Sequence, residues 1–180
     1  MSHWEFRPIA RSDFPLLGRW LLQPHVRRWW DDDASPEGIE ADYGACVDGT
    51  EPAQVFIAVR GGRPAGLAQR LRWHDYPEYL QEMETICPVP AGACSIDYLV
   101  GDPAATSQGW GTEMISAFMH LLWRDHPAAP AVIVPIHADN IASWRMLERV
   151  GFHRIAVGMR TPDNPADDGR HVVYRMDRPA

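Results

Sequence analysis

The sequence predicts an α/β fold, with a mixed sheet of about seven strands and helices on both faces. Apolar residues make up 46% of the 180 residues, which is enough for a sizeable core. Alternating or continuously apolar stretches predict strands, and segments with helical apolar spacing separate them. Strand–helix–strand units in the second half imply right-handed crossovers and parallel pairing. We expect a single domain over residues 1–180.

The first half of the chain predicts a short strand, three helical segments and an antiparallel hairpin. Ser12 is expected to cap the first helix. A glycine turn, "RGGR", joins the hairpin strands, and in the second of them Arg70 and Arg72 are expected to face away from the apolar side. The expected segments are a strand at 4–9, helices at 13–22, 24–30 and near 36–47, and strands at 55–59 and 65–73.

The second half predicts strands that alternate with helices. Residues 75–92 carry three prolines, a glycine and many acids, so we expect a long loop there. The segment 131–136 is continuously apolar, as buried parallel strands are. The expected segments are a strand at 93–101, a helix at about 109–125, a strand at 131–136, a helix at 139–151, and strands at 152–160 and 169–177.

The composition narrows the class of protein. The net charge of −7 argues against nucleic-acid binding, and no apolar run approaches the length of a membrane span. No secretory signal is evident, and the odd set of three cysteines contains no CxxC pair, so we expect a cytoplasmic protein without disulfides or metal. The acids cluster at 29–33 and 74–85. Such clusters fit a solvated surface or a cationic partner equally well.

The stretch "TSQGWGTEMI", residues 106–115, places two glycines around a tryptophan at the start of an amphipathic helix. Glycine lets a ligand approach the backbone, and the free N–H groups of a first helical turn attract anions. The stretch lacks the lysine of a P-loop, and Met114 breaks the GxGxxG spacing of dinucleotide folds. It therefore predicts a site for an anionic ligand of another kind.

This stretch resembles the motif of the GNAT acyltransferases, (Arg/Gln)-x-x-Gly-x-(Gly/Ala), with Gly109 and Gly111 in place and Thr106 where Arg or Gln is usual. In that family the loop and the helix start hold the pyrophosphate of acetyl-CoA through backbone amides. The resemblance thus implies a GNAT fold and acetyl-CoA as the cofactor. The residues implied to hold it here are Ser107, Gln108, Gly109, Trp110, Gly111 and Thr112.

A second segment, "NIASWRMLERVGF", resembles another GNAT signature, with Asn140, Glu148, Gly151 and Phe152 at matching separations. The resemblance implies that this helix flanks the pantetheine arm, with Asn140 near the thiol and Ser143 beside it. The tyrosine that often protonates the leaving thiolate is Leu147 in this chain. Water or another group must then protonate the thiolate.

Nearly the whole chain resembles the aminoglycoside 6'-N-acetyltransferases and, less closely, the siderophore lysine N-acyltransferases. The shared features are "HVRRWWDDD", an acidic insertion, and "SIDYLVG". Many aminoglycoside 6'-enzymes carry an antibiotic-gripping aspartate five residues before the helix asparagine, and here that position is Pro135. The acetylated amine is therefore left open between the 6' position and another, as in a kasugamycin-like substrate.

Asp97 is the expected general base. It interrupts an apolar strand, where aspartate is disfavoured, and in the resembled enzymes an aspartate at this place is the base. A carboxylate there accepts the proton that an ammonium must lose before its nitrogen attacks. A solvent-facing or arginine-paired aspartate is the alternative. Backbone amides around Leu99 and Val100 are expected to polarise the thioester carbonyl.

Further acidic and aromatic residues are candidates for binding a polyamine, because each charge-assisted hydrogen bond positions one ammonium group. Glu82 and Glu84 are favoured within the acidic segment, although a solvated role stays open for each acid. The tryptophans of "WWDDD" fit a wall under a sugar ring or ordinary helix packing. The candidate substrate residues are Trp29, Trp30, Asp32, Asp75, Glu82, Glu84, Tyr98, His137 and Asp139.

These observations predict acetyl-CoA-dependent N-acetylation of an aminoglycoside-like cationic amine by a monomer or homodimer, with no nucleic-acid or membrane partner. One alternative is N-acylation of a hydroxylysine-type siderophore precursor. A non-catalytic acyl-CoA-binding sensor is an alternative of another class, motivated by the missing tyrosine. Protein N-terminal acetylation is a fourth reading, disfavoured because the acidic segment would crowd an extended peptide.

Overall fold

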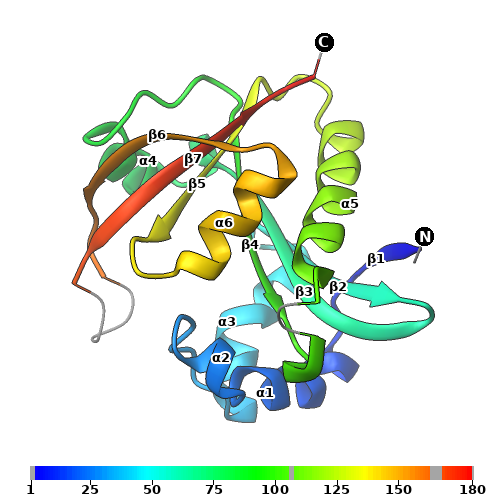
Figure 1. The fold of residues 1–180 in the computed structure, drawn as a ribbon. Helices are drawn as coiled ribbons and strands as arrows, with labels where there is room; N and C mark the ends of the chain where they lie inside the picture. Colours follow the sequence, from blue (N-terminus) through cyan, green and yellow to red (C-terminus); the bar gives the residue numbers. More distant parts are fainter. Residues whose placement is uncertain (1–2, 106–107, 163–167, 180) are drawn as a thin grey trace. The chain divides into compact units, whose positions relative to one another are not determined.

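The computed structural model describes residues 3–105, 108–162 and 168–179 (Figure 1). The chain forms two compact units, and each is described by itself. The first unit contains Met1–Gln69 and Tyr98–Phe118. The second contains Arg70–Asp97 and Met119–Ala180.

The strands follow the order β1-β2-β3-β4-β5-β7-β6 in one mixed sheet. The expected mixture of pairings is confirmed, since β1 and β2 are antiparallel and β4 and β5 are parallel. The parallel pairing implied for the unit β5–α6–β6 is wrong, because β7 lies between β5 and β6 in the sheet. The final hairpin places β7 antiparallel to both β5 and β6. The strand bounds are β1 Trp4–Pro8, β2 Gln54–Arg60, β3 Arg63–Arg72, β4 Cys94–Val100, β5 Ala131–His137, β6 His153–Met159 and β7 Arg170–Asp177.

The helices begin and end close to the predicted positions. Gly151, with φ of 112°, ends α6 in the left-handed conformation that favours glycine. The α-helices are α1 Phe14–Leu21, α2 Pro24–Arg27, α3 Pro36–Asp48, α4 Pro77–Glu84, α5 Trp110–Asp125 and α6 Ile141–Val150. Short 3₁₀ turns cover Arg11–Asp13, Trp73–Asp75 and Pro103–Ala105.

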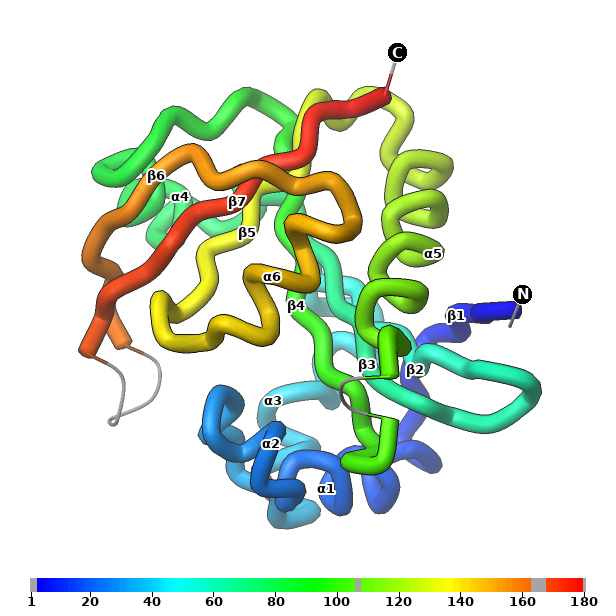
Figure 2. The backbone as a smooth tube through the Cα atoms, viewed as in Figure 1, coloured from blue at the N-terminus to red at the C-terminus, as the bar shows by residue number. Residues whose placement is uncertain are grey.

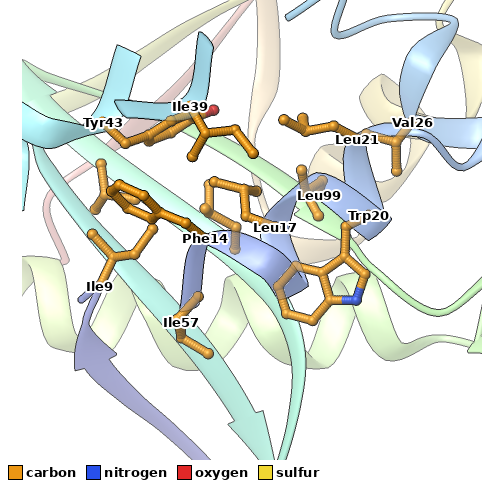
Figure 3. Close-up of a cluster of buried hydrophobic side chains, with 12 residues drawn as sticks. Ile9, Phe14, Leu17, Trp20, Leu21, Val26, Ile39, Tyr43, Ile57 and Leu99 are labelled. Carbon is orange, nitrogen blue, oxygen red and sulfur yellow. The ribbon is translucent and has the colours of Figure 1, made fainter. Parts of the chain in front are cut away.

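Apolar side chains from α1, α2 and α3 pack on those of β2, β3 and β4 in the first unit (Figure 3). Leu17 and Ile57 are fully buried at the centre of this cluster. Helix α5 joins the same unit through Phe118, whose ring lies 5.0 Å from that of Phe6 and 5.7 Å from that of Phe56. The middle of α5 is thereby fixed against β1 and β2.

The expected cap at Ser12 is wrong. The chain enters its first helix through the 3₁₀ turn Arg11–Asp13, and the carboxylate of Asp13 accepts a hydrogen bond from the Ala10 amide at 3.0 Å. Asp13 is buried and also accepts two hydrogen bonds from Arg7, both at 2.6 Å. Asp13 takes the place expected for Ser12 because its carboxylate accepts hydrogen bonds from the backbone and from a cation together.

Asp13→Asn is expected to lower the free energy of unfolding at pH 7 by about 1 kcal/mol, because the half-exposed Arg7 is screened by solvent. The hydrogen bonds from Arg7 lower the pKa of Asp13 below its ordinary 3.8. A depressed folded pKa stabilises above the unfolded pKa, and this stabilisation is lost as the pH falls through the folded pKa. The difference in thermal unfolding between the two proteins should therefore begin to shrink below about pH 4 and disappear only below the folded pKa of Asp13.

The exposed ion pair of Asp48 with Arg11 supplies the matched control. Asp48→Asn removes a similar two-bond contact from the surface, and it should shift the melting temperature less than Asp13→Asn does. An equal shift for the two variants contradicts the role assigned to Asp13.

In the second unit, β5 and β7 pair along their whole length, and β6 pairs with β7 across an irregularity at Arg154 and Ala156. Figure 2 shows β6 and β7 running side by side. Arg70, expected on the polar side of its strand, is buried instead and pairs with Asp125 at 2.8 Å. A buried cation is tolerated there because a carboxylate of α5 compensates its charge.

The expected long loop at 75–92 is wrong, because α4 forms within it. Pro77 stands at the first helical position, where proline is favoured. Leu80, Met83 and Cys87 have helical spacing and pack in the core cluster of the second unit. Met83 is fully buried. This short stripe fixes a segment whose acids and prolines had indicated a loop.

Among the described residues, none of the helices combines the length and apolarity that crossing a membrane requires. In the same part of the chain, no three His, Cys, Asp or Glu side chains gather in a group that could hold a metal ion.

Candidate functional site

Strand β4 presents one exposed carboxylate. Its first three residues are buried, and Asp97 then follows Ile96 as an exposed residue. A carboxylate that keeps contact with solvent at the end of a buried apolar run stays available to accept a proton. The strand thus holds Asp97 rigidly by its neighbours while leaving its side chain accessible.

The end of β4 is held by the first unit on several sides. Leu99 is 5% exposed, so only its backbone can face a ligand. The Val100 carbonyl lies 2.8 Å from Nε2 of His25, and the Gly101 amide donates to the Ala65 carbonyl at 2.9 Å. Gly101 also lies against Trp20, whose ring would be 2.2 Å from an added Cβ. These contacts fix the backbone at the place where a thioester carbonyl was expected to bind.

The turn before α5 contains one glycine in the left-handed backbone conformation. Gly109 has φ of 83°, and an added Cβ there would meet no atom within 4 Å. The carbonyl of Gly109 accepts the first intrahelical bond of α5, from Glu113 at 3.1 Å. The amides of the residues between them therefore belong to the first turn, which has no intrahelical acceptors. Gly111 and Thr112 are half-buried in this turn.

Two candidate cofactor residues use their side chains for contacts within the protein. The side chain of Gln108 donates to the Ala104 carbonyl at 2.5 Å, so it closes its own loop. The indole of Trp110 packs under the guanidinium of Arg60, 4.2 Å from the ring centroid. Trp110 therefore contributes its amide to the turn, while its side chain belongs to the fold. Ser107, together with Thr106, lies outside the described residues.

Helix α6 begins at Asn140, whose side chain accepts a hydrogen bond from the Ser143 amide at 3.3 Å. One polar atom of Asn140 thus caps the helix, and its amide group remains available for a ligand. Leu147 is fully buried, which confirms that this position carries core packing and no proton donor. Ser143 is half-buried in the first turn.

Asn140→Ala is expected to lower the free energy of unfolding by about 1 kcal/mol, because the first turn of α6 loses its cap. Asn140→Asp preserves the capping oxygen and should unfold near the wild-type temperature. Thermal unfolding by circular dichroism measures both variants. Unfolding of Asn140→Ala at the wild-type temperature contradicts the capping role.

Glu148, which matches the second GNAT signature, forms its hydrogen bond within the protein. Its carboxylate accepts a hydrogen bond from the hydroxyl of Tyr174 at 2.8 Å. Tyr174 is buried and stacks on Trp144 with 6.4 Å between ring centroids. Burial, together with the Glu148 carboxylate, raises the pKa of Tyr174 to about 12. This glutamate therefore ties α6 to β7.

His137 at the end of β5 has both ring nitrogens engaged. Its Nδ1 accepts a hydrogen bond from the Asp139 amide at 3.1 Å, so Nε2 carries the proton of the neutral ring. That nitrogen lies 3.4 Å from the carboxylate of Asp168. The ring is poorly arranged to act as a second base. Asp139 is exposed and accepts a hydrogen bond from Arg170 at 3.2 Å.

The acidic candidates of the second unit have different surroundings. Glu82 pairs with Arg160 at 3.0 Å and also accepts the Thr161 amide, so it connects α4 to the end of β6. Asp75 pairs with Arg72 at 2.8 Å. Glu84 is exposed on the same helix as Glu82. Of the two glutamates favoured from the sequence, Glu84 is the one that faces solvent.

The tryptophan–aspartate segment of the first unit borders an open depression of about 480 Å³. Asp32 accepts the Tyr43 hydroxyl at 2.9 Å, and Trp30 packs on the core cluster. Trp29 is half-buried, with the Arg28 guanidinium 4.8 Å from its ring centroid. The sequence analysis selected Asp32 but not Asp31 or Asp33, although all three belong to the same DDD run. The depression is lined by Leu21, Leu22, Arg27, Asp31, Asp32, Asp33, Ala34 and Ser35.

Comparison with known proteins identifies the family of this chain. The acetyltransferase (GNAT) domain family matches residues 10–158. The chain is 28% identical over 163 residues to aminoglycoside N(6')-acetyltransferase type 1 of Klebsiella pneumoniae, covering 89% of this chain and 78% of that protein. The protein of the same name from Serratia marcescens matches with equal identity and coverage.

The fold resembles the crystal structure of aminoglycoside acetyltransferase AAC(6')-Ib in complex with coenzyme A and kanamycin. The TM-score is 0.83 at 24% identity, covering 98% of this chain and 95% of that one. The matched family segment runs from the first helical turn through most of β6, and so takes in β4, the glycine turn, α5 and α6. The chain therefore belongs to the GNAT acetyltransferase family.

Proposed function

We propose that this chain transfers an acetyl group from acetyl-CoA to an amine of an aminoglycoside antibiotic. The observation that carries the proposal is the 28% identity, over 89% of the chain, to proteins named aminoglycoside N(6')-acetyltransferase. The chain also carries exposed carboxylates, the groups that form charge-assisted hydrogen bonds with the ammonium groups of such a substrate. We place the activity in the cytoplasm, carried out by a monomer or a homodimer.

The residues at the start of α5 fit the anionic part of CoA. Gly109 keeps the space beside the turn open, and the first-turn amides offer donors at the positive end of the helix dipole. Gly111 and Thr112 complete this set, and the Asn140 amide group would lie along the pantetheine arm. When bound, acetyl-CoA supplies an acetyl group activated as a thioester.

Asp97 acts as the general base in this proposal. Its carboxylate takes the proton that the substrate ammonium loses, directly or through one water, and the free amine can then attack the acyl carbon. The backbone of Leu99 and Val100, held by His25 and Gly101, offers a rigid donor row to the carbonyl oxygen. Since Leu147 is buried and apolar, water or another group protonates the departing thiolate.

The substrate contacts in this proposal come from the exposed and half-buried candidates. Glu84 offers an exposed carboxylate, and Asp139 offers one whose pairing with Arg170 is itself exposed to solvent, while Trp29 and Tyr98 offer aromatic surface. We infer that Glu82, Asp32 and Asp75 serve the fold through their ion pairs and hydrogen bonds. Pro135, where many 6'-enzymes carry an aspartate, widens the choice of amine to positions other than 6'.

The proposal is tested by CoA release, measured with a thiol-trapping dye, in separate reactions with kanamycin, tobramycin, kasugamycin and N6-hydroxylysine. We expect release with at least one aminoglycoside. Release of CoA with hydroxylysine alone indicates a role in siderophore synthesis and overturns the proposal. Silence in every reaction, with CoA binding confirmed by thermal shift, also overturns it and favours the non-catalytic sensor.

A further inference from the structure

Arg60, the last residue of β2, lies among residues from three elements of the first unit. Its guanidinium carbon is 4.2 Å from the ring centroid of Trp110 on α5 and 5.9 Å from that of Trp4 on β1. Its Nη2 donates to the carboxylate of Glu113 at 3.1 Å. The Trp4 indole donates to the same carboxylate oxygen at 3.3 Å. One cation thus joins two indoles and a glutamate.

Both α5 members of this cluster stand in the turn assigned to the CoA pyrophosphate. Trp110 is the first residue of the helix, and the Glu113 amide closes the first intrahelical bond. Glu113 therefore places a negative charge within one turn of the amides that would receive an anion. A carboxylate so placed competes with an anionic ligand for the positive helix end.

The arrangement compensates this charge and fixes the turn. Arg60 and Trp4 together hold the Glu113 carboxylate toward β1 and β2. The Arg60 side chain is 22% exposed and that of Glu113 is 48% exposed, so solvent screens this ion pair in part. Its Nε is buried and has no hydrogen-bond partner within the described part of the chain. Arginine is required here because only its planar head stacks on an indole while pairing with a carboxylate.

We propose that Arg60 is a positioning residue for acyl-CoA binding. It neutralises Glu113 beside the anion-binding turn of α5, and its stacking on Trp110 keeps the guanidinium beside that carboxylate. Arg60 itself touches no reacting atom. The inference rests on the proposed function, because it assigns the turn to the CoA pyrophosphate.

The test measures the dissociation constant of CoA by isothermal titration calorimetry for wild type, Arg60→Met, Glu113→Gln and the double variant. Arg60→Met is expected to weaken CoA binding roughly 3- to 10-fold, the effect of one uncompensated charge in the first turn. Glu113→Gln should bind CoA as tightly as wild type or more tightly. The double variant should recover most of the lost affinity, because no uncompensated carboxylate is left.

Thermal unfolding separates this role from a purely structural one. Both variants that lack Arg60 lose its stacking, so the melting temperature of the double variant should stay as low as that of Arg60→Met. In the double variant, CoA affinity then recovers while the melting temperature does not. Arg63→Gln, an exposed arginine on the same hairpin, is the control and should leave the affinity within twofold.

The outcomes are distinct. CoA binding by Arg60→Met within twofold of wild type overturns the inference. Equal weakening in Arg60→Met and in the double variant also overturns it, since Arg60 then acts through the fold alone. If wild type does not bind CoA, the proposed function fails instead, and that result is read before any variant is compared.

Discussion

Asp97→Asn is expected to lower kcat for the best aminoglycoside by roughly 10²- to 10⁴-fold, the usual contribution of a general base. Asparagine has nearly the same shape and cannot take the ammonium proton. The variant should bind CoA with wild-type affinity, because Asp97 lies on a different element from the glycine turn. Steady-state CoA release and calorimetric CoA binding measure the two quantities.

Glu5→Gln is a matched control, because Glu5 is also an exposed carboxylate on a strand. It should keep kcat within twofold of wild type. Full retention of activity in Asp97→Asn would remove Asp97 from the mechanism and reopen the search for a base. An equal loss of activity and of folded protein would make the aspartate structural.

Gly101→Ala is expected to reduce the free energy of unfolding by about 3 kcal/mol, the upper end of the usual cost of overpacking. The added methyl would lie 2.2 Å from two atoms of the Trp20 ring, which is itself buried in the core. The melting temperature should fall by roughly 6–12 °C for a chain of this size. Differential scanning calorimetry measures the shift.

A glycine at the tip of the β2–β3 hairpin gives the control for this variant. Gly61 has φ of 54°, and an added Cβ there meets nothing within 4 Å, so Gly61→Ala should cost only about 1 kcal/mol of backbone strain. Trp20→Phe combined with Gly101→Ala should recover part of the loss, since a smaller ring makes room. A loss in Gly101→Ala no greater than in Gly61→Ala contradicts the packing argument.

The sequence predicted most elements because their signals are local. The hairpin turn is an example, since Gly61 and Gly62 both have positive φ, as a two-residue turn with the strand twist requires. The helix over 36–47 begins one residue after Ser35, whose hydroxyl accepts the Gly38 amide at 3.0 Å. Such features depend on a few neighbouring residues, so they can be predicted without knowledge of the rest of the fold.

The missed features depend on contacts between distant residues. Helix α4 is stabilised by Met83 in a core that also contains Ile133 and Val173, far along the chain. The burial of Arg70 depends on Asp125. Trp110 matched a cofactor motif by position, yet its indole is taken by Arg60. Charge and composition cannot reveal which side chains are already paired within the fold.

Some residues of the candidate site could be placed from the sequence, and others could not. Motif spacing located the Gly109 turn, because backbone conformation there follows from the residue type, whereas the capping role of Asn140 is seen only in the structure. The acids were harder to sort, since Glu82 and Glu84 look alike in sequence. Only the structure separates the glutamate paired with Arg160 from the one exposed to solvent.

The contact of Glu82 with Arg160 and the Thr161 amide bears on how this protein can diverge. The acidic helix and the end of β6 are joined by this contact, so a change in either is selected in the presence of the other. Relatives that have lost this ion pair should differ at Glu82 and Arg160 together, since a change at one alone leaves a charge unmatched. The contact between the acidic helix and the end of β6 would then change by paired substitutions.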